Sequence, residues 1–139
     1  MTAAEPSEAF DAVIRTLDGD HDLEERMMLK VTVEQEESES LIEDHALNEV
    51  VVERTAVSQT VRMNVSMDGS FFTSYAADGL IISTPTGSTA YAFSARGPIV
   101  DASHHSIQIT PVSPHMLFDR TLVLAPSTEI ELQVTGNRT

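Results

Sequence analysis

A turn rich in small hydroxyl residues is the feature of this sequence whose residue types could do chemistry. Residues 83–91 read Ser-Thr-Pro-Thr-Gly-Ser-Thr-Ala-Tyr and follow the apolar run Leu80 to Ile82, which is typical of a buried strand. A proline and a glycine end that strand, and Thr86 or Ser88 is predicted to cap a helix over Thr89 to Arg96. A helix start offers free backbone N–H groups, and the hydroxyls add donors and acceptors. We therefore predict a loop that contacts a nucleotide.

Four further side chains could add contacts to such a ligand. Asn48 offers a donor and an acceptor and Glu49 offers acceptors only, so the pair could bind a base edge or ribose hydroxyls. Asp78 could accept hydrogen bonds from a ribose hydroxyl or from a nicotinamide amide, and Tyr91 could stack on a planar ring. Taken singly, each feature is equally typical of a strand end, a turn or a packed aromatic.

Two other chemistries deserve comparison with the nucleotide hypothesis. Ser88 with His115 and an aspartate could form a hydrolase site, but the second glycine of a nucleophile elbow is missing. His104 and His105 with Asp101 could bind a metal, but adjacent histidines usually point apart. We therefore favour structural roles for these residues. Neither a Gly-x-x-x-x-Gly-Lys nor a Gly-x-Gly-x-x-Gly motif is present.

The composition indicates one small globular domain with an unusual charge. The 139 residues contain no cysteine, no apolar run long enough to cross a membrane and no signal segment, so we expect a cytoplasmic protein without membrane association. The formal net charge is −14, and Lys30 is the only lysine. This balance disfavours nucleic-acid binding and predicts a halophilic protein of haloarchaeal type, in which salt screens the repulsion.

The acidic charge is concentrated in one half of the chain. Residues 1–60 hold 16 acidic and 4 basic residues, a net charge of −12, whereas residues 61–139 hold 6 and 4, a net charge of −2. The nearly neutral half contains the hydroxyl-rich turn. That distribution suits a site for an anionic ligand.

Hydrophobic periodicity predicts a mainly β, sandwich-like domain with one or two short helices, spanning 1–139. A helix capped by Ser7 is expected to run to Leu17 and to end at Asp18-Gly19. The stretch from Glu34 to Ser40 is predicted to be a turn or an exposed hairpin tip. Asp68-Gly69 is a hairpin signal. Strands are expected at 28–33, 47–53, 61–67, 71–76, 80–82, 106–111, 121–124 and 129–134.

Four ordered segments closely resemble the NAD kinase family, which uses ATP or polyphosphate. The longest is residues 78–91, Asp-Gly-Leu-Ile-Ile-Ser-Thr-Pro-Thr-Gly-Ser-Thr-Ala-Tyr, and the others are residues 25–29, 46–51 and 109–115. The resemblance extends from about residue 10 to residue 134 and concerns the family's C-terminal, NAD-binding domain only. The N-terminal α/β domain, which carries a Gly-Gly-Asp-Gly motif with the family's general base, has no counterpart, because the chain contains no Gly-Gly pair.

The resemblance implies phosphorylation of the adenosine ribose 2′-hydroxyl of NAD, with ATP or polyphosphate and Mg²⁺ as the donor system. Because the general base and donor contacts belong to the other domain, we expect this chain alone to have little or no activity. It further implies homo-oligomers whose NAD sites use two subunits, and it leaves room for a partner chain that supplies the α/β domain. The alternative is a non-catalytic nucleotide-binding module derived from such a kinase.

The resemblance also implies site residues. Asn48 would contact the adenine or its ribose, and Asp78 would hold the nicotinamide end. One departure concerns Arg96-Gly97-Pro98, where the family usually has Gly-Gly-Pro, so an arginine replaces a conformationally free glycine. The complete implied NAD-binding set is Asn48, Glu49, Asp78, Thr86, Thr89, Ala90, Tyr91, Ala92, Phe93 and Ser94, with no catalytic or metal-binding residue.

Overall fold

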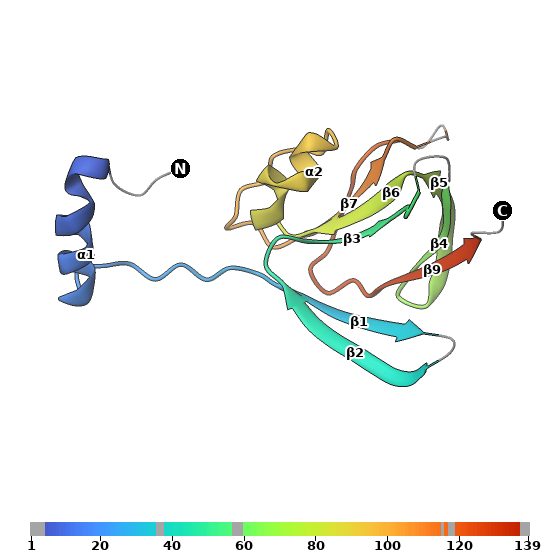
Figure 1. Ribbon diagram of the computed structural model, residues 1–139, viewed down its shortest axis with the longest axis horizontal. Helices are drawn as coiled ribbons and strands as arrows, with labels where there is room; N and C mark the ends of the chain where they lie inside the picture. The colour runs from blue at the N-terminus through green and yellow to red at the C-terminus, as the bar shows by residue number, and fades with distance from the viewer. Residues whose placement is uncertain (1–4, 36–37, 57–59, 115, 117–118, 137–139) are drawn as a thin grey trace.

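Two antiparallel sheets packed face to face form the body of the protein (Figure 1). The computed structural model describes residues 5–35, 38–56, 60–114, 116 and 119–136. This architecture confirms the predicted mainly β, sandwich-like fold. One sheet has the order β3-β6-β7-β8 and the other β5-β4-β9. Their bounds are β3 Glu49–Glu53, β4 Val61–Met67, β5 Ser70–Ala77, β6 Gly79–Ser83, β7 Ile107–Val112, β8 Leu122–Leu124 and β9 Ile130–Gly136.

The core lies between the two sheets because alternate residues of each strand point inward. Met63 and Val65 of β4 face Leu80 of β6 and Ile109 of β7, and all four side chains are fully buried. The chain passes from the three-stranded to the four-stranded sheet at Asp78, which lies between β5 and β6. Asp78 is therefore fixed by both sheets.

The hairpin predicted from Asp68-Gly69 is confirmed. Both residues have positive φ angles, 50° and 73°, as a two-residue turn of the primed type requires. The Asp68 carboxylate also accepts a hydrogen bond of 2.9 Å from the Glu129 N–H, which ties the turn to the start of β9.

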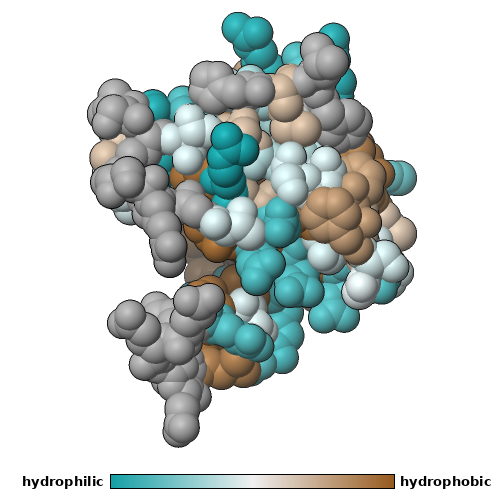
Figure 2. Space-filling view, turned by 90° about the vertical axis from the view of Figure 1, so that its right-hand side faces the viewer, coloured by the Kyte–Doolittle hydropathy of each residue, from teal (hydrophilic) through white to brown (hydrophobic). Residues whose placement is uncertain are grey.

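A second hairpin, β1 Leu29–Gln35 with β2 Ser38–Ala46, lies beneath the sandwich in Figure 1. The hairpin connection predicted between Glu34 and Ser40 is confirmed, because β1 and β2 pair on either side of it, but β2 itself was not predicted as a strand. The base of the hairpin packs against the core through Leu29 and partly buried neighbours, whereas residues further out, such as Ile42, are exposed. Figure 2 shows a corresponding lower lobe set off from the body of the molecule.

Helix α1, Ala9–Leu17, stands apart from the sandwich and is joined to it by an extended segment (Figure 1). It follows a short 3-10 turn, η1 Pro6–Glu8, so the predicted cap by Ser7 is wrong; Glu8 precedes the helix and makes no side-chain cap. The predicted end at Asp18-Gly19 is confirmed. The apolar face is uncovered, since Phe10, Val13, Ile14 and Leu17 are 43–77% exposed. Within the described residues, no helix has the length and apolar character needed to cross a membrane.

We predict that Tyr75 makes the fold sensitive to alkaline pH. Its side chain is 1% exposed, and burial raises the pKa of its phenol above the ordinary value of 10.0. Because the folded-state pKa is the higher one, this contribution to stability is complete below pH 10 and is lost as the pH rises through the folded pKa. Melting temperatures measured between about pH 9 and pH 12 should therefore fall more steeply for the wild type than for Tyr75→Phe. Equal slopes would contradict this assignment.

Candidate functional site

The hydroxyl-rich turn is anchored to the start of β3 by the backbone of Leu47 and Asn48. The Thr84 N–H donates to the Asn48 carbonyl at 2.9 Å, and the Thr84 hydroxyl donates to the Leu47 carbonyl at 2.6 Å. The same hydroxyl accepts a hydrogen bond of 3.1 Å from the Gly87 N–H. One buried threonine therefore joins two segments that lie 36 residues apart in the sequence.

Gly87 makes this contact possible because it has no side chain. A Cβ on Gly87 would lie 2.5 Å from the Asn48 carbonyl carbon, nearer still to its oxygen, and 2.9 Å from its Cα. These atoms belong to the backbone of the residue directly before β3, whose carbonyl is already bonded to the Thr84 N–H, so they cannot move aside cheaply. The structure thus places Asn48 directly against the turn that the sequence predicted as a ligand loop.

The predicted helix from Thr89 to Arg96 is shorter and broken. A 3-10 turn, η2 Thr86–Thr89, is followed by one helical turn, α2 Tyr91–Ser94, and the two are separated at Ala90, where ψ is −126°. Neither Thr86 nor Ser88 provides a side-chain cap, so that prediction is wrong.

The hydroxyl groups bond elsewhere instead. The Ser88 hydroxyl donates to the Val100 carbonyl at 3.1 Å and accepts from the Val100 N–H at 3.0 Å. Ser88 is also fully buried, so its place is structural and it is not positioned as a nucleophile. Thr86 and Thr89 are more accessible: the Thr86 hydroxyl accepts a long hydrogen bond from Arg26, and the Thr89 hydroxyl donates to the Thr86 carbonyl. His115 lies outside the described residues.

A row of polar side chains crosses the four-stranded sheet beside the turn. Glu49, Ser83 and Gln108 are direct neighbours on β3, β6 and β7, so their side chains lie on one face. Within the described residues, Glu49 Oε2, Ser83 Oγ and Gln108 Oε1 are buried without a hydrogen-bond partner. Buried polar atoms without partners are rare, and a carboxylate oxygen can accept only from a donor. Glu49 is therefore placed to accept a hydrogen bond from a ligand hydroxyl or from water.

Ser83 and Gln108 were not identified from the sequence. Their importance depends on strand register. The register brings Glu49, Ser83 and Gln108 together, although Ser83 lies 34 positions after Glu49 and Gln108 lies a further 25 positions along the chain. The strand-like alternation of residues 107–111 was recognisable, but nothing local showed which residue would lie opposite Ser83 and Glu49.

Asp78 lies at the opposite end of the β3–β6 pair from Glu49. Its carboxylate forms an ion pair of 3.1 Å with Arg54, and its backbone bonds to both Arg54 and Val112. Ser83, the strand partner of Glu49, lies five positions after Asp78, which corresponds to roughly 17 Å of extended chain. One copy of the chain therefore does not bring Asp78 and Glu49 into contact. Arg54 was not identified from the sequence, because its ion pair with Asp78 depends on the pairing of β3 with β6.

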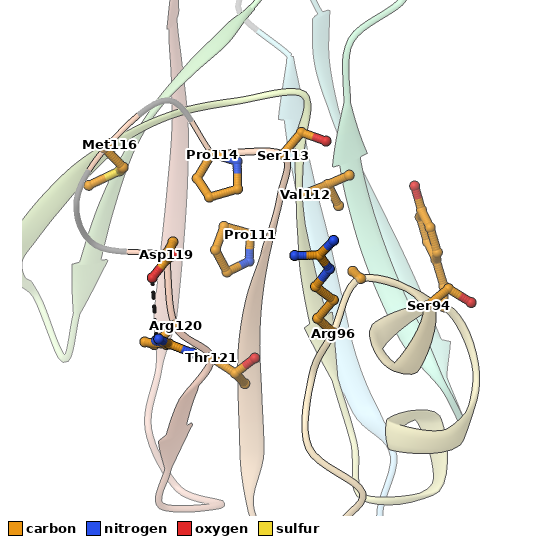
Figure 3. A pocket seen from close by; sticks show the side chains of 12 residues that line it. Ser94, Arg96, Pro111, Val112, Ser113, Pro114, Met116, Asp119, Arg120 and Thr121 are labelled. Carbon is orange, nitrogen blue, oxygen red and sulfur yellow. Dashed lines mark ion pairs between the residues drawn. The ribbon is translucent and has the colours of Figure 1, made fainter.

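A cavity of about 470 Å³ lies between α2 and the end of β7 (Figure 3). Of the implied NAD-binding residues, Tyr91 and Ser94 line it, whereas Thr86, Thr89 and Ala90 do not. Neither Ala92 nor Phe93 of α2 lines the cavity. Ala92 is fully buried, and Phe93 is 54% exposed. The remaining lining residues are Ala95, Arg96, Pro111, Val112, Ser113, Pro114, Met116, Asp119, Arg120 and Thr121.

The alternative metal site considered at Asp101, His104 and His105 is not formed. The Asp101 carboxylate accepts hydrogen bonds from the N–H and hydroxyl of Ser103 at 2.9 and 2.7 Å, and these bonds hold the pKa of the carboxyl below its ordinary value. In the part of the chain that the structure describes, no three histidine or acidic side chains converge as metal ligands.

We predict that Gly87→Ala disrupts the anchor between the turn and β3. The new methyl group collides with the Asn48 backbone, so the free energy of unfolding should fall by about 1–3 kcal/mol in denaturant titrations. Gly69→Asn is the matched control. A Cβ meets nothing within 4 Å there, and asparagine tolerates a φ of 73°, so its effect should stay below about 0.5 kcal/mol. Equal effects of both substitutions would contradict the anchor.

Comparison with known domains identifies the part of the chain that contains this site. Residues 47–139 match the ATP-NAD kinase C-terminal domain family. Curated relatives include the NAD kinases of Thermoanaerobacter sp. (strain X514), 38% identical over 97% of this chain, and of Halorhodospira halophila, 41% identical over 91%. This chain covers only 47% and 42% of these two proteins, so it spans less than half of their length. The curated relatives are bacterial and do not support a haloarchaeal source.

Two solved structures that resemble this chain are kinases of NADH or NAD, in agreement with the sequence relatives. Yeast NADH kinase complexed with NADH superposes with a TM-score of 0.88 and 31% identity, covering 92% of this chain and 38% of that one. An NAD kinase from Archaeoglobus fulgidus in complex with ATP has the same fold, with a TM-score of 0.73 and 23% identity over 95% of this chain and 50% of that one. The chain belongs to the NAD kinase family, and it contains the family's C-terminal domain.

Proposed function

We propose that this chain is the NAD-binding part of an NAD kinase. The observation that carries the proposal is the convergence of Asn48 and Glu49 with the hydroxyl-rich turn, where a buried Glu49 oxygen lacks a hydrogen-bond donor. A ribose presents vicinal hydroxyls, and such a hydroxyl is the kind of donor that this carboxylate accepts. The Asn48 amide beside it offers both a donor and an acceptor for the adenine or its ribose.

The proposed reaction is phosphoryl transfer to the adenosine ribose 2′-hydroxyl of NAD. Phosphoryl transfer depends on positioning and charge stabilisation, and this chain would supply the positioning of the acceptor. We assign the donor, its Mg²⁺ and the general base to the half of the relatives that this chain does not span, because the resemblance places the Gly-Gly-Asp-Gly motif there. The chain alone should accordingly form little or no NADP. If it binds NAD and has no such partner, it is the non-catalytic module.

A calorimetric titration with NAD in molar KCl tests the site. Glu49→Gln replaces the unpartnered carboxylate by an amide of the same shape, so NAD affinity should fall at least about tenfold. Glu53→Gln, the same change at the exposed other end of β3, is the control and should leave affinity unchanged. Absence of NAD binding by the wild type, or equal affinity in both variants, would overturn the proposal.

We further propose that Asp78 completes the site of a second copy. Asp78 and Glu49 lie at opposite ends of the β3–β6 pair, whereas the resemblance implies that both contact NAD. A site shared between two subunits reconciles these facts. The Arg54 ion pair holds the Asp78 carboxylate in a partly exposed position at the rim of both sheets, where another molecule can reach it.

Subunit complementation tests this arrangement. Asp78→Asn and Glu49→Gln should each weaken NAD binding on their own, because every site then lacks one carboxylate. Mixing the two variants should restore one wild-type site in each mixed dimer, measurable by calorimetry, while light scattering reports a dimer or larger assembly. A wild-type chain that stays monomeric, or a mixture that recovers no binding, would contradict a shared site.

The uncovered face of α1 fits contact with the α/β half of such a kinase. Alignment with the relatives covers 97% of the chain and therefore includes α1, yet α1 precedes residue 47, where the C-terminal domain match begins. Four exposed apolar side chains on a helix outside that domain are typical of a surface buried elsewhere. We propose that the α/β half, on the same or a separate chain, covers it.

We also propose a salt-adapted protein that works in the cytoplasm. The support is the net charge of −14 with a single lysine, and the 16 acidic residues among residues 1–60.

A further inference from the structure

Two residues with strained backbone angles line the cavity between α2 and β7. Outside glycine, the described residues with positive φ are Asp68, Arg96 and Ser113. Asp68 is explained by its hairpin turn, whereas Arg96, at 69°, and Ser113, at 45°, both line the cavity. Left-handed backbone is unfavourable for residues with a Cβ, and its concentration at a pocket is typical of binding sites.

The strain at Arg96 follows from the way α2 ends. The Gly97 N–H donates to the Ala92 carbonyl at 2.8 Å, a six-residue closure that forces the residue before Gly97 into the left-handed region. Glycine is the usual residue at that position because it adopts the conformation without cost. This chain has an arginine there instead, and its left-handed backbone has a cost that a role of the side chain could offset.

The described lining of the cavity carries more positive than negative charge, although the chain as a whole is strongly acidic. Its lining contains Arg96, Arg120 and one carboxylate, Asp119, in a chain of net charge −14. Asp119 and Arg120 pair with each other at 3.4 Å, whereas Arg96 forms no ion pair with any residue that the structure describes. Figure 3 shows the Arg96 guanidinium in front of Pro111 and Val112, across the cavity from the Asp119–Arg120 pair.

We propose that this cavity binds a phosphate group and that Arg96 recognises it. A guanidinium offers paired N–H donors that match two oxygens of a phosphate, and the hydroxyls of Ser94 and Thr121 in the lining can add further bonds. The proposal rests on the proposed function only for the source of the phosphate, which is the pyrophosphate of NAD. The cavity begins at Tyr91, directly after the turn that adjoins Asn48.

Calorimetric titrations of the full chain with inorganic pyrophosphate, NAD, NADP and uncharged adenosine test this site. Arg96→Asn keeps a residue that tolerates the left-handed region but removes the charge, so affinity for pyrophosphate and NAD should fall about tenfold or more. Arg96→Lys should lose less affinity for these two ligands than Arg96→Asn. Arg15→Gln, which removes one positive charge from exposed α1, should change neither the pyrophosphate affinity nor the NAD affinity. Adenosine should bind equally to all variants.

Arg96→Gly separates binding from stability. Relief of the strained backbone should raise the melting temperature by about 2–4 °C, while phosphate affinity falls as in Arg96→Asn. A merely structural arginine would not produce opposite changes. Equal affinities of wild type, Arg96→Asn and Arg15→Gln for every phosphate ligand would overturn the inference.

The outcomes also distinguish this inference from the proposed function. NAD binding that is independent of Arg96 would leave the proposed function standing and remove the phosphate site. Pyrophosphate binding that requires Arg96, without any NAD binding, would support the phosphate site and remove the proposed function. An Arg96 effect on NADP alone would support the phosphate site with the 2′-phosphate as its source. If neither NAD nor pyrophosphate binds, both fail.

Discussion

The close approach of the Asn48 backbone to the turn at Thr84 and Gly87 positions the other parts of the proposed site. Two hydrogen bonds of Thr84 and the missing side chain of Gly87 hold the turn against the first residue before β3. The pairing of β3 with β6 then fixes Glu49 opposite Ser83, in a buried polar row. Without that contact the turn would be a surface loop, and Asn48 and Glu49 would be an ordinary polar start of a strand.

Features determined by neighbouring residues could be predicted from the sequence. The alternation over Val61–Met67 and the Asp68-Gly69 turn both depend on local chemistry, and both were correct. Strand β2 was missed because its Glu, Asp and Ser residues are typical of a loop, and because its exposed position removes the alternation that burial imposes. Its pairing with β1 decides the outcome, and that partner is not local.

The hydroxyl-rich turn shows the same limit at the site. A turn at this place was predictable from residue types, but its hydroxyls do not cap the helix as expected. Thr84 and Ser88 bond instead to Leu47 and Val100, which lie 37 and 12 residues away. Ser83, Gln108 and Arg54 were missed for the same reason, since their roles follow from strand register and from the crossing between the sheets.

The distribution of charge and exposure gives the chain two different regions. The acidic first 60 residues include an isolated amphipathic helix and an exposed hairpin, whereas the nearly neutral remainder forms most of the sandwich and the cavity with two arginines. The proposed ligand site therefore lies on the four-stranded sheet and beside α2, and the proposed contacts with other protein surfaces lie on α1 and at Asp78.

An NAD titration followed by backbone amide chemical shifts tests the central claim most directly, because it reports where the ligand binds. The account predicts the largest saturable shifts at the amides of Asn48 and Glu49, of Thr84 and of residues 86–91, where the turn meets β3. Shifts confined to other surfaces, such as α1 or the β1–β2 hairpin, or no saturable shift at millimolar NAD, would contradict it.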